Sequence, residues 1–261
     1  MSGPAWLVLP TYNEAANLDA VVRAAQAALA SVAPGEHGIL IVDDNSPDGT
    51  GEIADALAAE LSALRVLHRP NKEGLGPAYL AGFEWVLNAG AEYIMEMDAD
   101  FSHDPADLPR LLEVARAGSD LVLGSRYTRG GAVAGWTWPR RLISRAGSIY
   151  ARLVLGLPQR DLTGGMKCFR ASTLELIGLP AVRSRGYAFQ IELTYRATRA
   201  GLRVTELPIT FHDRRAGASK MSAAIALEAA WLVPMLRLRR WRPGAAGAAG
   251  AEPTAASDRR A

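Results

Sequence analysis

Two aspartates, Asp98 and Asp100, stand one residue apart at the end of a short apolar run, 93–97. We interpret this run as a buried strand. Side chains two residues apart in an extended chain point the same way, so the two carboxylates leave the strand end together. Adjacent carboxylates raise each other's pKa unless a cation or hydrogen-bond donors lie between them. Because Mg²⁺ is commonly shared between carboxylates and substrate phosphates, the pair indicates a metal site for a phosphorylated substrate, with a solvated turn as the alternative.

Short apolar runs alternate with amphipathic segments through the first half of the chain. We predict five strands with helices between them, the strands lying at residues 6–9, 39–42, 66–67, 93–97 and 120–125. Apolar positions recur at helical spacing from Leu18 to Leu29, and Asn13 is the predicted N-cap of that helix. Asp104 and Pro105 predict the cap and first position of a later helix. The alternation predicts an α/β fold: a mostly parallel, doubly wound sheet with helices on both faces.

Polar clusters follow four of the predicted strands, at the carboxyl ends where open α/β sheets bind ligands. They are PTYNE at 10–14, DDNSPDGT at 43–50, the Asp98–Asp100 pair and GSRY at 124–127. Four clusters at one edge are hard to explain as ordinary loops, so they predict a binding site. The nearest histidine, His103, is expected to cap the following helix or to face solvent.

Beyond residue 129 the alternation stops and basic residues predominate. A loop with Trp136 and Trp138 leads into a predicted amphipathic helix at 139–155. Tryptophan beside a basic amphipathic helix is typical of a membrane surface, so we place the 129–160 segment at a membrane interface. The predicted organisation is one domain over 1–222, a C-terminal amphipathic helix at 223–242 and a disordered Gly/Ala/Pro-rich tail at 243–261.

Composition narrows the class of protein. The chain has 261 residues, 49% of them hydrophobic, and a net charge of +2. A single cysteine, Cys168, excludes an internal disulfide framework and favours a reducing compartment. We see no signal peptide, and the most apolar segment, 223–236, is interrupted by Glu228 and Pro234 and falls short of the roughly 20 apolar residues that a membrane span needs. We therefore expect a soluble or peripheral protein.

Eight motifs occur in a fixed order along the chain: LPTYNE, VDDNSPDGT, GLGPAY, MDADFSHDP, GSRY, DLTGGMKCFR, RGYAFQIE and RRAGASKM. Together they resemble the family 2 glycosyltransferases of the GT-A fold, and within these the polyprenol (dolichyl) phosphate mannose synthases. The resemblance covers about residues 5–222. Each motif alone is weak, whereas the ordered series is specific.

The resemblance implies GDP-mannose as a donor bound across the strand ends. It implies Asp98, Asp100 and Arg126 as catalytic residues, with Asp98 and Asp100 as ligands of Mg²⁺ or Mn²⁺. The donor-binding residues that it implies are Pro10, Tyr12, Glu14, Val42, Asp44, Asp98, Ala99, Asp100, Arg126, Arg214 and Lys220. A planar guanidinium can bind phosphate through two parallel hydrogen bonds, and lysine supplies a mobile charge. Gly217 would let its loop close over the donor as a lid.

The implied reaction transfers mannose to a polyprenyl monophosphate and inverts the anomeric centre. The acceptor phosphate oxygen is already anionic, so catalysis needs positioning and neutralisation of the departing diphosphate rather than a strong base. Candidate residues for the acceptor phosphate are Arg126, Arg140, Lys167 and Arg170. The resemblance also implies peripheral contact with the cytoplasmic face of a membrane, either directly or through a separate membrane-anchoring protein.

Several alternatives stay open on the residues alone. Nothing in the residue chemistry selects the base or the sugar, so a polyprenyl-phosphate glucosyltransferase using UDP-glucose is the nearest alternative. A polysaccharide-building enzyme would need a base carboxylate, and only Gln190–Glu192 approaches that pattern. A nucleotidyltransferase would normally show a glycine-rich loop after the first strand. A non-catalytic nucleotide-binding relative would be expected to have lost Asp100 or the basic residues, and no nucleic-acid-binding motif is present.

Overall fold

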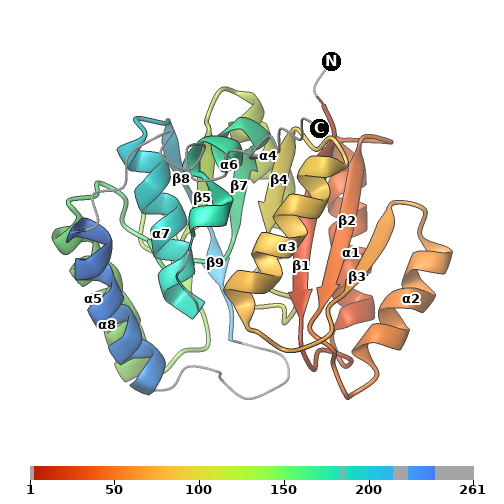
Figure 1. The fold of residues 1–261 in the computed structure, drawn as a ribbon, viewed down its shortest axis with the longest axis horizontal. Coiled ribbons are helices and arrows are strands. Elements are labelled where there is room, and N and C mark those ends of the chain that lie inside the picture. The colour runs from red at the N-terminus through yellow and green to blue at the C-terminus, as the bar shows by residue number, and fades with distance from the viewer. Residues whose placement is uncertain (1–2, 183, 185, 214–222, 239–261) are drawn as a thin grey trace, which may run out of the picture.

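The computed structural model describes residues 3–182, 184, 186–213 and 223–238. Its centre is a seven-stranded sheet with the order β3-β2-β1-β4-β7-β5-β8 (Figure 1). The strands are β1 (Ala5–Thr11), β2 (His37–Asp43), β3 (Leu64–His68), β4 (Tyr93–Glu96), β5 (Leu121–Ser125), β7 (Lys167–Arg170) and β8 (Val204–Pro208). All neighbours pair in parallel except β7, which runs antiparallel to both β4 and β5. The predicted α/β sheet is confirmed, with two strands more than predicted.

Helices cover both faces of the sheet, as predicted. One face packs against α1 (Leu18–Val32), α2 (Thr50–Glu60) and α4 (Leu108–Arg116). The other packs against α3 (Leu75–Asn88), α6 (Ala171–Ile177) and α7 (Gly186–Arg199). The period of two along a strand explains the division, since Leu7 and Leu9 enter the first core and Val8 the second.

The structure shows where the two helices with predicted N-caps begin. The prediction for Asn13 was wrong, because α1 begins at Leu18 and its N-cap is Asn17. A turn from Glu14 to Asn17 separates Asn13 from the helix, and in it the backbone N–H groups of Asn17 and Leu18 donate to the Glu14 carbonyl. The prediction for Asp104 is confirmed. Its side chain accepts from the Ala106 N–H at 2.9 Å, at the head of a 3₁₀ turn, Pro105–Asp107, that leads into α4.

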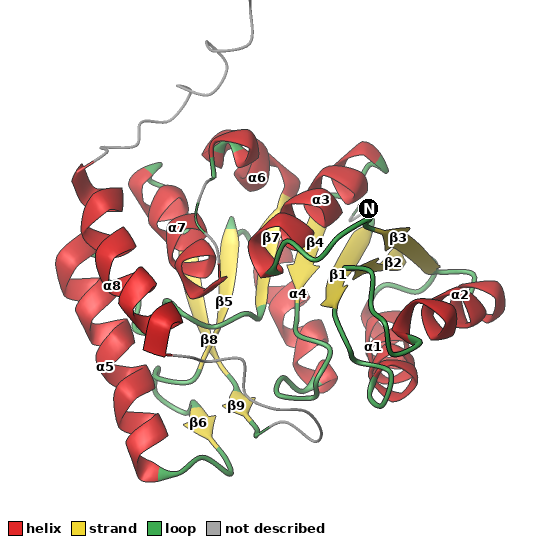
Figure 2. Ribbon diagram, turned by 60° about the horizontal axis from the view of Figure 1, so that its bottom comes forward, coloured by secondary structure: helices red, strands yellow, loops and turns green. Residues whose placement is uncertain are grey.

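A smaller layer lies at the end of the sheet beyond β8. There α5 (Trp138–Leu155) and α8 (Ala223–Leu238) lie side by side against α7 (Figures 1 and 2), around Leu155, Tyr195 and Val233. A two-stranded ribbon, β6 (Ala132–Val133) with β9 (Thr210–Phe211), stands beside them. The predicted helix at 139–155 is confirmed.

Other predicted boundaries are not tested. The boundary at residue 222 and the tail at 243–261 lie outside the described residues and stay predictions. Within the part of the chain that the structure describes, no helix is both long enough and apolar enough to cross a bilayer.

Candidate active site

The loops after β1 and β2 are joined to each other at the carboxyl edge of the sheet. Thr11 donates to Asp43 at 2.9 Å, and the backbone N–H of Glu14 donates to the hydroxyl of Thr50 at 3.0 Å. The backbone N–H of Asn13 likewise donates to Ser46. The first two polar clusters of the sequence therefore form one connected structure, as the parallel sheet predicts.

The carboxylate of Asp44 orders a further loop at this edge. It accepts hydrogen bonds from Arg69 and from the backbone N–H groups of Glu73 and Gly74. The same loop places Lys72 Nζ 3.7 Å from the centre of the Tyr12 ring. This 69–74 loop was not predicted; its signal is the short polar and charged run RPNKE directly after a strand.

Asp98 and Asp100 follow β4 at the same edge, as predicted. Asp100 is buried and accepts from the Ser102 N–H at 2.9 Å, whereas 28% of the Asp98 side chain is exposed. Among the described residues no group of three or more His, Cys, Asp and Glu side chains could enclose a metal ion. A pair of carboxylates, one of them exposed, fits Mg²⁺ or Mn²⁺ when substrate phosphate oxygens complete the coordination.

Backbone strain is concentrated at this edge. In the described part of the chain, the non-glycine residues with positive φ are Asn13, Asn45 and Phe101, at +58°, +57° and +59°. They lie in the loops after β1, β2 and β4. A bulky residue such as Phe101 in this region is a genuine outlier, and such strain is typical of functional sites.

His103 neither caps the following helix nor faces solvent, so that prediction was wrong. Its ring is fully buried, edge-on to Phe211 with 5.0 Å between ring centres, and Nδ1 lies 3.9 Å from Asp98 Oδ2. Burial lowers the pKa of His103 to about 4, with nearby Asp100 opposing the shift, so the ring is neutral at pH 7.

Arg126, which follows β5, is held by a buried carboxylate. Its Nε and Nη2 each donate to Asp161 at 2.7 Å, its backbone N–H donates to Asp161 at 2.9 Å, and Nη2 also reaches the Thr163 hydroxyl at 2.8 Å. Burial raises the pKa of Asp161, but the guanidinium outweighs it and holds the pKa below its usual range. Asp161 was not among the predicted site residues, and its only signal in the sequence is an acidic residue three positions before a Gly-Gly pair.

The four candidates for the acceptor phosphate separate in the structure. Arg126 and Arg140 come together, since their guanidinium carbons lie 5.9 and 4.2 Å from the centre of the Trp136 ring. Arg140 also pairs with Asp213 at 2.8 Å. The predicted phosphate-binding roles of Lys167 and Arg170 do not agree with their placement: Lys167 is buried with its ammonium group bonded to protein acceptors, and the antiparallel direction of β7 carries Arg170 away from the strand ends. Lys167 points into the core, and Arg170 lies opposite Tyr93, at the far end of β4 from Asp98.

The remaining candidates are placed as follows. Pro10 and Val42 lie near the ends of β1 and β2, and Ala99 is buried between the two aspartates. Arg214, Gly217 and Lys220 lie outside the described residues.

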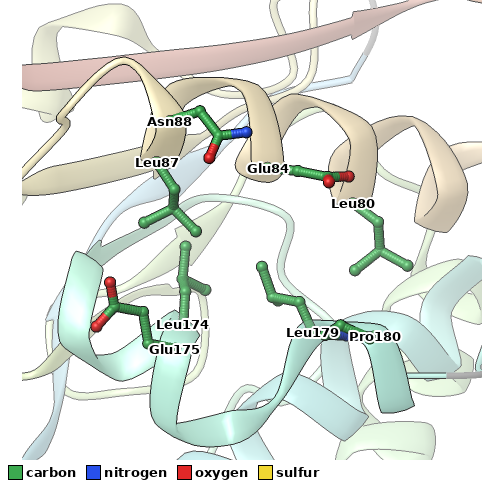
Figure 3. A pocket seen from close by; sticks show the side chains of 8 residues that line it. All are labelled: Leu80, Glu84, Leu87, Asn88, Leu174, Glu175, Leu179 and Pro180. Carbon is green, nitrogen blue, oxygen red and sulfur yellow. The ribbon is translucent and has the colours of Figure 1, made fainter. Parts of the chain in front are cut away.

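A groove of about 490 Å³ lies between α3 and α6 (Figure 3), lined by residues such as Leu80, Leu174 and Leu179. None of its lining residues belongs to the strand-end clusters.

Comparison with known proteins decides the family. Residues 6–178 match the family model described as glycosyl transferase family 2. The chain belongs to glycosyl transferase family 2. It is 47% identical over 234 residues to an undecaprenyl-phosphate mannosyltransferase of Micrococcus luteus, covering 90% of this chain and 92% of that one. It is 48% identical over 236 residues to a polyprenol monophosphomannose synthase of Mycolicibacterium smegmatis, covering 90% and 85%.

Solved structures support the same fold for this glycosyltransferase. Glucosyl-3-phosphoglycerate synthase from Mycobacterium tuberculosis, in complex with Mn²⁺, uridine diphosphate and glucosyl-3-phosphoglycerate, has a TM-score of 0.62 at 18% identity. The match covers 90% of this chain and 80% of that one. Staphylococcus aureus TarS in complex with UDP-GlcNAc has a TM-score of 0.61 at 16% identity, covering 89% and 66%. The predicted GT-A fold is confirmed.

Proposed function

We propose that this glycosyltransferase transfers mannose from GDP-mannose to a polyprenyl monophosphate. The observation that carries the proposal is the 47–48% identity, over 90% of the chain, to two enzymes named for mannose transfer to polyprenyl phosphates. The site agrees with such a reaction, because a carboxylate pair and an ordered arginine lie where the sheet presents ligands. The choice of GDP as the nucleotide rests on the motif resemblance.

The donor would bind across the joined loops after β1 and β2. Tyr12 offers an aromatic face to the base, and Glu14 and Asp44 lie at the same edge for the ribose. Pro10, Val42 and Ala99 would line the nucleotide, with Arg214 and Lys220 as further candidates. Asp98 and Asp100 would hold Mg²⁺ or Mn²⁺, and that ion would supply charge neutralisation for the diphosphate.

The acceptor phosphate would lie beside Arg126 and Arg140, whose guanidinium groups both lie close to the Trp136 ring. One of its oxygens forms the new bond to the anomeric carbon while the bond from that carbon to the diphosphate oxygen breaks, so the configuration inverts. The nucleophile is already an anion and needs no base. The neutral, buried His103 is consistent with this scheme, since it is not required to accept a proton.

We also propose that α5 contacts the membrane in which the acceptor lies. One face of this helix exposes Trp138, Leu142 and Leu153 to 75%, 60% and 72%, although each is apolar. Exposed arginines at 141, 145 and 152 lie along one side of that stripe. Apolar residues bordered by cations suit the surface of an anionic bilayer, so the chain would associate peripherally with the cytoplasmic leaflet, directly or with an anchoring protein.

The test is transfer of radiolabel from GDP-mannose or UDP-glucose, in parallel reactions with Mg²⁺ and a short polyprenyl phosphate. We expect label in the lipid only from GDP-mannose, and none after addition of EDTA. Label only from UDP-glucose would replace the donor assignment, and label from neither would contradict the acceptor. Arg65→Ala is the control, since this exposed arginine of β3 bonds to the nearby backbone carbonyls of Ser62 and Leu64 and should keep full activity.

A further inference from the structure

Lys167 lies at the centre of a buried polar cluster inside the sheet. It stands directly opposite Glu96 in the antiparallel register of β7 and β4. Its ammonium group donates to Glu96 Oε1 at 2.8 Å, to the Gly164 carbonyl at 3.0 Å and to Gln190 Oε1 of α7. An ammonium group has three N–H donors, so these acceptors use all of them.

Stability alone does not account for this cluster. Lys167 and Glu96 are fully buried, so neither charge is stabilised by water. Glu96 Oε2 and Gln190 Nε2 have no hydrogen-bond partner within the part of the chain that the structure describes. Apolar side chains of similar volume often stabilise a core as well as a buried ion pair does, or better. The cluster therefore suggests a second role.

The cluster binds the turn at residues 163–165 through the Gly164 carbonyl, and the position of this turn indicates the second role. At one end, Thr163 accepts a hydrogen bond from Arg126 at 2.8 Å. At the other, Gly165 lies so close to Asp98 that a Cβ there would be 3.5 Å from both carboxylate oxygens. Gly164 lies between them, with its carbonyl bound to Lys167. The turn thus connects the two halves of the candidate active site.

We propose that Lys167 is a positioning residue, which fixes the Gly164 carbonyl and so sets the spacing between Arg126 and the Asp98–Asp100 pair. This inference rests on the proposed function for its effect on the reaction, but not for the anchoring itself. A displacement of about 1 Å in a catalytic group can cost about a hundredfold in rate. Loss of the anchor should therefore lower kcat by about 10- to 100-fold.

The informative variant removes both charges. Lys167→Met alone would leave the Glu96 carboxylate buried without a cation, which favours misfolding. Glu96→Leu/Lys167→Met replaces the pair by apolar side chains of similar size. The matched control, Glu192→Leu/Arg196→Met, removes a second buried ion pair, whose arginine binds backbone carbonyls at 177–181, outside the site.

Three measurements test whether Lys167 positions the turn: thermal melting, hydrogen–deuterium exchange of the 161–166 segment, and mannosyl transfer. We expect Glu96→Leu/Lys167→Met to melt near the wild-type temperature, to exchange about tenfold faster at 161–166, and to lose kcat by about 10- to 100-fold. Its Kd for GDP, measured by calorimetry, should change less than about threefold, because the nucleoside contacts lie at β1 and β2. The control should retain wild-type exchange at 161–166 and wild-type kcat.

Unchanged exchange at 161–166 in the double variant would overturn the proposal whatever the activity. So would wild-type kcat in the folded double variant, or an equal loss of kcat in the control. If the wild-type protein transfers no sugar from either donor, the proposed function fails, and the exchange measurement still decides whether Lys167 anchors the turn.

Discussion

Replacing two leucines on the exposed face of α5 should weaken membrane binding strongly. The perturbation is Leu142→Ser/Leu153→Ser. These side chains lie eleven residues apart, which is close to three helical turns, so they share one face. Neither belongs to the buried set that holds α5 against α7 and α8, so folding should be unaffected. The variant therefore tests the surface rather than the core.

The size of the effect follows from the exposed fractions. Full burial of a leucine side chain contributes about 2 kcal/mol, and Leu142 and Leu153 have 60% and 72% of their surface still exposed. Entry of both into a bilayer surface would contribute about 2–3 kcal/mol. A factor of ten in affinity corresponds to about 1.4 kcal/mol, so the double variant should bind vesicles roughly thirty- to 140-fold more weakly.

The assay is sedimentation of the protein with phosphatidylglycerol/phosphatidylcholine vesicles over a range of lipid concentrations. Leu176→Ser is the control, because Leu176 is also an exposed leucine, at 40%, but lies on α6, away from the α5 surface. The control should bind as wild type does. If the double variant partitions as wild type does, or if Leu176→Ser weakens binding equally, then α5 does not enter the bilayer and the reasoning is refuted.

Three further results are expected. Asp100→Asn should reduce metal-dependent transfer by about a hundredfold or more while leaving the melting temperature in EDTA unchanged, because it removes ligand charge only. Asp161→Asn should lower the free energy of unfolding by about 3–5 kcal/mol. Because the pKa of Asp161 is depressed in the folded state, this difference should hold from pH 9 to about pH 5. It should shrink as denaturant unfolding is repeated below about pH 4, where the carboxylate of the unfolded chain protonates before that of the folded protein. Burial raises the pKa of Cys168 to about 12, so mass spectrometry should find no alkylation by iodoacetamide at about pH 8 until the protein unfolds.

The arrangement of the strand-end clusters, where we propose that the donor binds, could be predicted because its signals are local. Each polar cluster there directly follows an apolar run, and the parallel order of β1, β2 and β4 brings the clusters to one edge without further information. The distinction between Asp43, which bonds Thr11, and Asp44, which orders the 69–74 loop, was not visible, because it depends on contacts between distant segments.

The region where we propose that the acceptor binds was harder to predict, because a short apolar pattern does not indicate the direction of a strand. The segment KCFR is four residues long and lies within a polar stretch, so nothing local indicates a strand between β4 and β5. Its antiparallel direction turns Lys167 toward Glu96 and carries Arg170 to the opposite edge. The pairing of Arg126 with Asp161 was hidden for a related reason, since 35 residues separate the partners.

The position of α5 connects the lipid surface to the chemistry. The helix begins at Trp138, two residues after Trp136, whose ring lies close to the guanidinium groups of both Arg126 and Arg140. The exposed apolar stripe is thus adjacent in the chain to the arginines that we propose bind the acceptor phosphate. If the stripe enters the bilayer surface, Arg126 lies near the level of the head groups, where a polyprenyl phosphate carries its charge. In the proposed function the acceptor would then react without leaving the membrane, and the leucine variants should lower transfer to long-chain acceptors in vesicles more than to short, water-soluble ones.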